Sequence, residues 1–331
     1  MAASASFSTW TESMAIVPSP NSRTGQPAPG RTAPHGVVTR LTPTAPESGN
    51  RIELPLLGGR PPLSKQEFNE IRKFIYDEAG IDLHAGKEAL VAVRLGKKLI
   101  AAGLKSYQEY FRLVKADRSG NLLTEMVDAL TTNFTGFLRE PVHFEFLKKN
   151  ILPALAPRQR VDIWSAACST GEEPYSIAFV ALETLGVKAV HQVHILASDI
   201  STKVLGFARE GLYSQDRISG IPPDWQKKYL SKEASAVPAW RIRPEARKMV
   251  EFQRMNLMEP LHHFRACPVI FLRNVMIYFD RTTQEALVKR IIAHLEPGGH
   301  LLIGHSESLT RMNLGLEYVA PATYRKPGKL R

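Results

Sequence analysis

Apolar residues recur at helical spacing in the first part of the chain that has a regular pattern. Ser64 followed by Glu67 is a capping-box pattern that opens a helix, Phe68 and Ile71 begin its apolar face, and Gly80 ends it. The same period predicts three further helices, over 87–102, 106–116 and 119–131. This part of the chain is therefore expected to be an all-helical unit.

From about residue 161 the pattern changes to short apolar runs that alternate with helical segments. Strands are predicted over 161–166, 193–198, 268–272 and 300–304, helices over 174–185, 202–211 and 281–295, and a turn over 297–299. Strands that alternate with helices imply right-handed crossovers and a mostly parallel sheet, so we expect an α/β fold.

Two segments depart from both patterns. Residues 1–63 are rich in Ser, Pro, Thr, Gly and Ala and predict a disordered tail. Residues 217–255 interrupt the alternation and predict an inserted small β-subdomain. We expect a helical N-terminal domain and linker over 64–140 and an α/β domain over 141–331 that carries this insertion.

Composition and charge limit the cellular compartment and the kinds of partner that we expect. Two cysteines among 331 residues form no disulfide framework and fit a reducing cytosol. No signal peptide or membrane-spanning run is expected, so the chain is predicted to be cytoplasmic, without membrane insertion. The net charge of +11 predicts an acidic partner. No aromatic residues interleave with the basic ones as single-stranded nucleic acids require, so no nucleic-acid partner is expected.

The loop after the first predicted strand has the character of a ligand site. Ligands of open α/β sheets bind outside the carboxyl ends of the strands. This loop is rich in small residues, lacks a dinucleotide-type glycine pattern, and carries Glu172 and Glu173, which would repel phosphate and suit a cationic ligand. The two carboxylates could equally complement the dipole of the following helix. Asp199, at the end of the second strand, is placed to accept hydrogen bonds from ribose hydroxyls.

Five segments together resemble one family over about residues 64–327. They are Leu130–Arg139, Trp164–Ser176, Ala197–Ile200, Phe271–Asp280 and Gly304–Glu307. In residue identity, order and spacing these segments are similar to the CheR-type chemotaxis receptor methyltransferases. The resemblance implies a Rossmann-like domain that binds S-adenosylmethionine (SAM), an inserted β-subdomain, and a preceding all-α domain. It also implies methyl transfer from SAM to glutamate carboxylates of chemoreceptors, with S-adenosylhomocysteine as the second product and no metal ion.

The resemblance also assigns residues. Arg139 and Tyr278 are expected at the reacting end, with Tyr278 near the transferred methyl group and Arg139 on the SAM carboxylate. Tyr278 could instead be a packed aromatic residue. The expected cofactor contacts are Asn133, Thr135, Arg139, Glu173, Asp199, Asn256, Leu257, Asn274 and Val275. Phe134 and Leu138 depart from the usual family residues and are expected to affect packing only, and His305 is either a substrate-site or a structural residue.

A basic stripe is predicted on the second helix. Projected at about 100° per residue, Lys87, Arg94, Lys98 and Lys105 fall on one line, with Val93 and Ile100 among the apolar residues opposite. The stripe is either a solvated face or, as the resemblance implies, a docking surface for the acidic helices of methyl-accepting receptors. The insertion carries nine Lys/Arg against four Asp/Glu, and the resemblance allows it to tether a receptor C-terminal peptide. A monomer is expected.

Two rival functions remain at this stage. One is SAM-dependent methylation of another substrate, a nucleic acid or a small molecule. The other is a non-catalytic SAM-binding signalling module.

Overall fold

The computed structural model describes residues 61–132, 134–234, 238–261 and 265–329. The predicted tail lies outside the described residues except for its last three positions. Four helices come first: α1 (Lys65–Ala79), α2 (Glu88–Ala101), α3 (Tyr107–Ala116) and α4 (Asn121–Leu130). Their buried faces form one hydrophobic core, to which each helix contributes. Among the described residues, no helix has the length and apolar character that a membrane crossing requires.

The sequence signals at both ends of α1 are confirmed. The Ser64 hydroxyl accepts a 3.2 Å hydrogen bond from the Glu67 amide, and the Ser64 amide donates one of 2.9 Å to the Glu67 carboxylate. Gly80 follows with φ 71°, a left-handed conformation that favours glycine. A side chain there would also collide with Met258, whose sulfur would lie 2.5 Å from the added carbon.

The buried face of α2 is only partly the one expected, because Gly96 and Leu99 of the predicted packed side are buried. Val91, Leu95 and Leu99 are buried against the neighbouring helices, whereas Val93 and Ile100 are 44% and 51% exposed. The prediction that Val93 and Ile100 lie on the packed side was wrong, because α2 has apolar residues on two faces and only contacts with the other helices decide between them.

A seven-stranded sheet follows and confirms the mixed α/β fold. Its strands are β1 (Val161–Ala166), β2 (Val193–Asp199), β6 (Val250–Arg254), β7 (Cys267–Leu272), β8 (Leu295–Ile303), β9 (Glu317–Ala320) and β10 (Thr323–Arg325). The order is β6-β2-β1-β7-β8-β10-β9. The first five strands in this order pair in parallel, and β10 pairs antiparallel with both β8 and β9.

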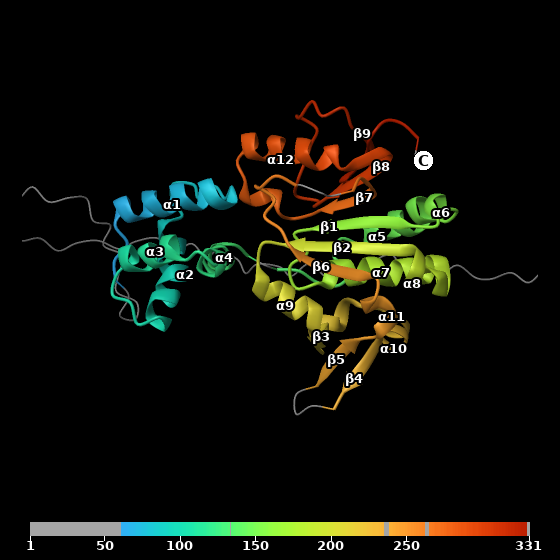
Figure 1. Ribbon diagram of the computed structural model, residues 1–331, viewed down its shortest axis with the longest axis horizontal. Coiled ribbons are helices and arrows are strands. Elements are labelled where there is room, and N and C mark those ends of the chain that lie inside the picture. The colour runs from blue at the N-terminus through green and yellow to red at the C-terminus, as the bar shows by residue number, and fades with distance from the viewer. Residues whose placement is uncertain (1–60, 133, 235–237, 262–264, 330–331) are drawn as a thin grey trace, which may run out of the picture. The chain divides into compact units, whose positions relative to one another are not determined.

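Helices cover both faces of the sheet, as Figure 1 shows with α7 and α12 on opposite sides. They are α5 (Pro141–Phe146), η1 (Leu147–Ile151), α6 (Leu152–Leu155), α7 (Glu172–Leu185), η2 (Gly186–Lys188), α8 (Ala189–Gln192), α9 (Thr202–Glu210), η4 (Met276–Tyr278) and α12 (Arg281–Ala293). Along β7, Val269 and Phe271 belong to the core on the α7 side, and Ile270 and Leu272 to the core on the α12 side. Burial on both faces explains the continuous apolar run of this strand.

A second sheet interrupts the chain between α9 and β6. It consists of β3 (Leu212–Ser214), β4 (Leu230–Glu233) and β5 (Ala239–Ile242) in the antiparallel order β3-β5-β4, with η3 (Arg217–Gly220), α10 (Pro223–Tyr229) and α11 (Pro244–Arg247) beside the strands. Its bounds differ from the expected 217–255. The small sheet begins at Leu212, and Val250–Arg254 pairs with β2 in the large sheet.

The turn expected at residues 297–299 lies inside β8. The pairing of β7 with β8 shifts register between Cys267 and Val269, so these residues form an irregularity within the strand. Gly298 has φ 79°, and a side chain on Gly299 would lie 2.9 Å from the carbonyl oxygen of Pro268. Glycines allow the two strand backbones to approach at this place.

Candidate functional site

The carboxyl ends of β1, β2 and β7 meet at one edge of the sheet, where a pocket opens. The loop after β1 is sharply turned, because Ala167 and Ser169 have φ 63° and 50°. Gly171, at φ 93°, then leads into α7, and a side chain there would lie 2.8 Å from Ala208 and 2.9 Å from the Tyr213 hydroxyl. The small residues noted in the sequence thus keep the loop backbone close to both the pocket and α9.

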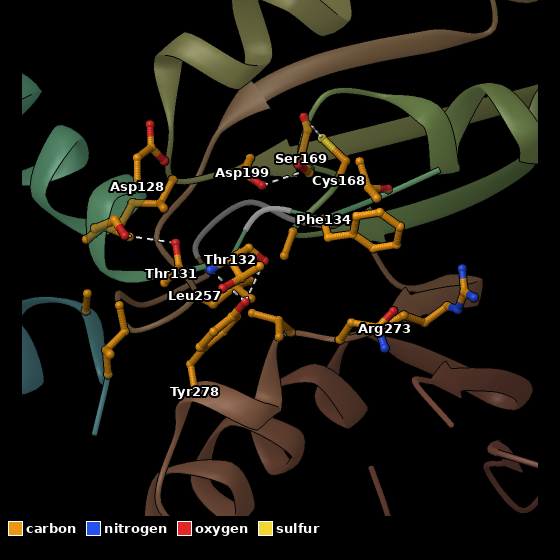
Figure 2. Close-up of a pocket in the computed structure, with 18 of the residues that line it drawn as sticks. Asp128, Thr131, Thr132, Phe134, Cys168, Ser169, Asp199, Leu257, Arg273 and Tyr278 are labelled. Carbon is orange, nitrogen blue, oxygen red and sulfur yellow. Dashed lines mark hydrogen bonds between the residues drawn. The ribbon is translucent and has the colours of Figure 1, made fainter. Parts of the chain in front are cut away.

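Asp199 closes one end of the pocket at the carboxyl end of β2. Its two carboxylate oxygens each accept a 2.9 Å hydrogen bond, one from the Ser169 amide and one from the Ser201 amide. Figure 2 shows the first of these, which joins the end of β2 to the loop after β1. Burial raises the pKa of Asp199 to about 6, and the nearby Asp128 adds to the rise. Asp199 therefore becomes a full hydrogen-bond acceptor only above that pH.

Arg273 lies at the centre of a buried ion network in the pocket wall. It follows β7 and is 5% exposed. Its guanidinium donates to Glu173 at 2.7 Å, to Glu140 at 3.1 Å and to the Arg139 carbonyl oxygen. The Ser165 hydroxyl also donates to Glu173, at 2.7 Å. The network fixes the Glu173 carboxylate at the pocket wall.

The second carboxylate of this network, Glu140, joins three segments of the chain. It accepts hydrogen bonds from the Asn274 side chain at 3.2 Å and from the His305 amide at 3.2 Å. Although burial opposes ionisation, the Arg273 guanidinium and the hydrogen bonds of Asn274 and His305 hold the pKa of Glu140 below its usual value. Beside it, burial together with Arg273 lowers the pKa of His143 to about 4, so this imidazole is neutral at pH 7.

Arg139 reaches the pocket from the linker between the helices and the large sheet. Its guanidinium donates a 2.8 Å hydrogen bond to the Phe134 carbonyl oxygen and lies 5.7 Å from the centre of the Phe134 ring. No carboxylate of a described residue forms an ion pair with it, so its charge remains for a ligand. Phe134 is 74% exposed and lines the pocket, so the expectation that it affects packing only was wrong.

Tyr278 connects the large sheet to this linker. Its hydroxyl donates to the Thr132 carbonyl oxygen at 2.7 Å and accepts from the Thr132 amide at 3.1 Å (Figure 2). The ring also packs against the edge of the helical core. Tyr278 is therefore neither a free side chain nor a fully buried one.

The expected residues that follow β6 and β7 line further walls of the pocket. Asn256 donates to the Glu78 carbonyl oxygen at 2.9 Å and accepts from the Met258 amide at 3.0 Å, so its side chain is engaged in holding the loop after β6. Asn274 has φ 58°, and its amide donates to Glu307 at 3.0 Å. Leu257 and Val275, the residues that follow these asparagines, supply apolar wall.

One pocket thus brings together every expected cofactor contact that the structure describes: Thr135, Arg139, Glu173, Asp199, Asn256, Leu257, Asn274 and Val275, with Tyr278. The expectation for Asn133 lies outside the described residues. No role was expected from the sequence for Asp128, Arg273 or Glu140. Arg273 and Asp128 line the pocket, and Glu140 and Arg273 directly adjoin assigned residues, which was the available signal.

Glu172, the other carboxylate of the loop, does not line the pocket. It is fully buried and forms an ion pair with Arg217 of η3. Thr170 links the two, because its hydroxyl donates to Glu172 at 2.8 Å and accepts from Arg217 at 2.6 Å. Tyr213 of β3 donates to the Thr170 carbonyl oxygen at 2.7 Å. The small sheet and its flanking residues therefore hold the loop from behind.

None of the four residues of the predicted basic stripe lines the pocket, and their surroundings differ. Arg94 donates to the carbonyl oxygens of Leu130 and Thr131 at 3.0 and 2.8 Å, and Lys98 forms a 2.7 Å ion pair with Glu125. Lys87 and Lys105 are exposed and flank α2 rather than lying within it. Arg94 and Lys98 thus bind α4 and its end, where a cation complements the helix dipole.

The charges of the pocket suit a zwitterionic ligand with an additional positive centre. Glu173 and Asp199 offer acceptors, Arg139 offers a guanidinium, and small residues and apolar walls lie between them. Cys168 also lines the pocket, but burial raises the pKa of its thiol well above the ordinary value, so it is no nucleophile at neutral pH.

Comparison with known families gives two adjoining matches. Residues 66–131 match the family described as "CheR methyltransferase, all-alpha domain", and residues 133–324 match "CheR methyltransferase, SAM binding domain". The second match alone spans more than half of the chain and contains most of the pocket residues.

Individual relatives agree with these matches. The chain is 39% identical over 272 residues to a chemotaxis protein methyltransferase of Borreliella burgdorferi, covering 80% of this chain and 95% of that protein. It is 38% identical over 263 residues to chemotaxis protein methyltransferase 2 of Pseudomonas aeruginosa (79% and 93% covered). It is 36% identical over 252 residues to the chemotaxis protein methyltransferase of Escherichia coli (76% and 87% covered).

Proposed function

Because this chain belongs to the CheR methyltransferase family, a family of SAM-dependent enzymes, we propose that its acceptors are glutamate side chains of chemoreceptors. The products would be glutamyl γ-methyl esters and S-adenosylhomocysteine. The observation that carries the proposal is the single pocket that gathers Arg139, Glu173, Asp199 and Tyr278.

The side chains of the pocket fit SAM group by group. Arg139, which has no carboxylate partner among the described residues, would hold the SAM carboxylate through paired hydrogen bonds. Glu173 would accept from the methionine amino group, and Asp199 from the ribose hydroxyls. Leu257 and Val275 would pack against the adenine and the methionine chain, beside the backbone of Asn256 and Asn274. Thr135 and Asn133 would complete the linker side.

Methyl transfer to a carboxylate requires alignment of the two reacting groups but no general base. When bound, SAM supplies an activated methyl group. A glutamate carboxylate, with a reference pKa near 4.3, is already ionised at neutral pH. The protein must therefore align the acceptor oxygen with the methyl group and exclude water. Tyr278, held by Thr132 at the linker, would shape the approach to the methyl group.

The receptor would dock on the helical part. Lys87 and Lys105 are exposed beside the two ends of α2, on the side opposite to Val93 and Ile100. An acidic receptor helix is complementary to these two cations. Arg94 and Lys98 are not free docking cations, because both have partners on α4 or its end.

The remaining assignments are proposals of the same kind. The small sheet would serve as a tether for a receptor C-terminal peptide in receptors that carry one. The chain would act as a cytoplasmic monomer, with a helical domain and linker over 64–140 and a catalytic domain over 141–331.

One experiment tests the acceptor. The purified protein is incubated with methyl-labelled SAM and either receptor-containing membranes or RNA, and the products are then treated with alkali. Alkali-labile label on a membrane protein supports a methyl ester of a carboxylate. Label on RNA refutes the proposal, and tight SAM binding without transfer to any acceptor would indicate a non-catalytic SAM-binding module.

A further inference from the structure

A cluster of side chains of the metal-binding type lies beside the pocket, although the sequence predicted no metal ion. Glu140 and His143 come from the start of α5, and His305 follows β8, 165 positions after Glu140. One donor atom of each residue lies within 4.8 Å of the other two. Only the fold brings these three residues together.

His143 is the anomaly that points to a ligand. Its side chain is fully buried, and among the described residues neither ring nitrogen makes a hydrogen bond of good geometry, although the backbone of Pro321 faces the ring. Buried polar atoms are almost always satisfied, because an unsatisfied one costs about 1–3 kcal/mol. One ring nitrogen lies 3.5 Å from the Glu140 carboxylate, and the ring packs edge-to-face against His305 at 4.8 Å.

We propose that Glu140, His143 and His305 bind a divalent transition-metal ion of the zinc type. Two imidazoles and one carboxylate are a donor set that Zn²⁺ prefers, with water completing a tetrahedron. Donors at about 2.0–2.1 Å from zinc stand roughly 3.3 Å apart, so the widest separation must close by about 1.5 Å. His305 can supply this movement, because its side chain is exposed, and the same exposure lets the ion enter from solvent.

The surrounding charges permit a cation. This part of the network contains three carboxylates and one guanidinium, that of Arg273. The carboxylates are those of Glu140, Glu173 and Glu307. Arg273 retains Glu173 and the Arg139 carbonyl oxygen as partners if Glu140 turns toward a metal ion.

A metal ion bound to this cluster would change contacts of residues that line the pocket. Glu140 holds Arg273 and Asn274, and both of these line the pocket. A metal ion that draws Glu140 toward the histidines weakens those contacts, so the ion would lower SAM affinity. This consequence rests on the proposed function of the pocket, whereas metal binding itself does not.

The test measures metal binding directly. The full chain is stripped with a chelator and titrated with Zn²⁺ by calorimetry and with Co²⁺ by visible absorption, which reports the ligand field. We expect one ion per chain and at least about tenfold weaker binding by His305→Ala. His191→Ala, which removes an exposed histidine from α8 at the opposite end of the strands, is the matched control.

Each outcome decides the matter. Loss of binding in His305→Ala but not in His191→Ala supports the site, provided that the variants keep the wild-type far-UV spectrum and thermal midpoint. Absence of stoichiometric binding by the wild type, or equal binding by His305→Ala, overturns it. SAM affinity is then measured with and without Zn²⁺. If the ion binds and SAM affinity stays constant, the inhibitory consequence is refuted while the metal site stands.

Discussion

The hydroxyl group of Tyr278 and the backbone of Thr132 exchange two hydrogen bonds, of 2.7 and 3.1 Å. A single side chain from the large sheet thereby satisfies both polar groups of a linker residue at the pocket. Since each net hydrogen bond contributes about 1 kcal/mol, Tyr278→Phe, which removes two, should weaken SAM binding by about 5- to 30-fold, as measured by calorimetry. Tyr76→Phe, which removes a hydroxyl 3.2 Å from Thr283 outside the pocket lining, serves as the control. Equal SAM affinity of wild type and Tyr278→Phe would contradict the prediction.

Arg273 is expected to be essential for stability, because it is buried between two carboxylates. Arg273→Met leaves both charges uncompensated and should lower the free energy of unfolding by about 3–5 kcal/mol, measured by urea titration. Adding Glu173→Gln removes one of these charges and should recover part of the loss. A loss below about 1 kcal/mol in the single variant would show that the network contributes little.

Asp199 should make both SAM binding and stability depend on pH. Because the pKa of Asp199 is raised to about 6 in the folded chain, above its value of 3.8 in the reference state, the native state retains a proton that the unfolded chain releases. The contribution of Asp199 to stability is therefore present below about pH 4 and is lost as the pH rises through 6. SAM affinity should change in the opposite sense and rise over the same window, since the ribose needs the carboxylate.

Asp199→Asn tests both effects. The variant should bind SAM more weakly at pH 8 and lose the pH dependence of SAM affinity and of stability near pH 6. It should not be more stable than the wild type, because its one amide oxygen cannot accept from both Ser169 and Ser201. A wild-type pH profile in the variant would assign the dependence to another group.

Arg217 should affect SAM affinity although it does not line the pocket. Arg217→Met leaves Glu172 buried without its ion pair, and we expect a stability loss of about 3 kcal/mol together with weaker SAM binding through the loop 167–171. The matched control is Arg241→Met, which breaks a pair with Glu233 that is about one-third exposed on both sides and should cost under about 1 kcal/mol. Similar losses in the two variants would refute a special role of Arg217.

If receptor helices dock near α2, substitutions there should change the rate of methyl transfer to the receptor but not the affinity for SAM. Lys87→Glu combined with Lys105→Glu should slow methyl transfer to receptor membranes, with less effect at high salt, and leave SAM affinity unchanged. Lys188→Glu combined with Lys329→Glu, both at exposed positions outside the helical part, makes the same change in net charge and is the control. An unaltered transfer rate in the double variant would remove α2 from the docking surface.

The sequence predicted the pocket better than the surface of the helical part. Motifs at strand ends, such as Glu173 and Asp199, could be placed because parallel strands bring their carboxyl ends together. The packed side of α2 could not, because its apolar residues lie on two faces. Pairs that depend on long-range approach, such as Arg217 with Glu172 and Arg273 with Glu140, have no local signature. The hairpin of β9 and β10 was missed because its strands have only four and three residues.

The ion pair between Arg217 and Glu172 also constrains how such proteins can be recombined. The segment from Leu212 to Arg247 looks like an exchangeable module, since it forms its own small sheet between two strands of the large one. A chimera that imports this segment from a relative without a cation at position 217 would inherit an uncompensated charge beneath the loop 167–171. Successful grafts should therefore carry the arginine with them or replace Glu172 by glutamine in the recipient.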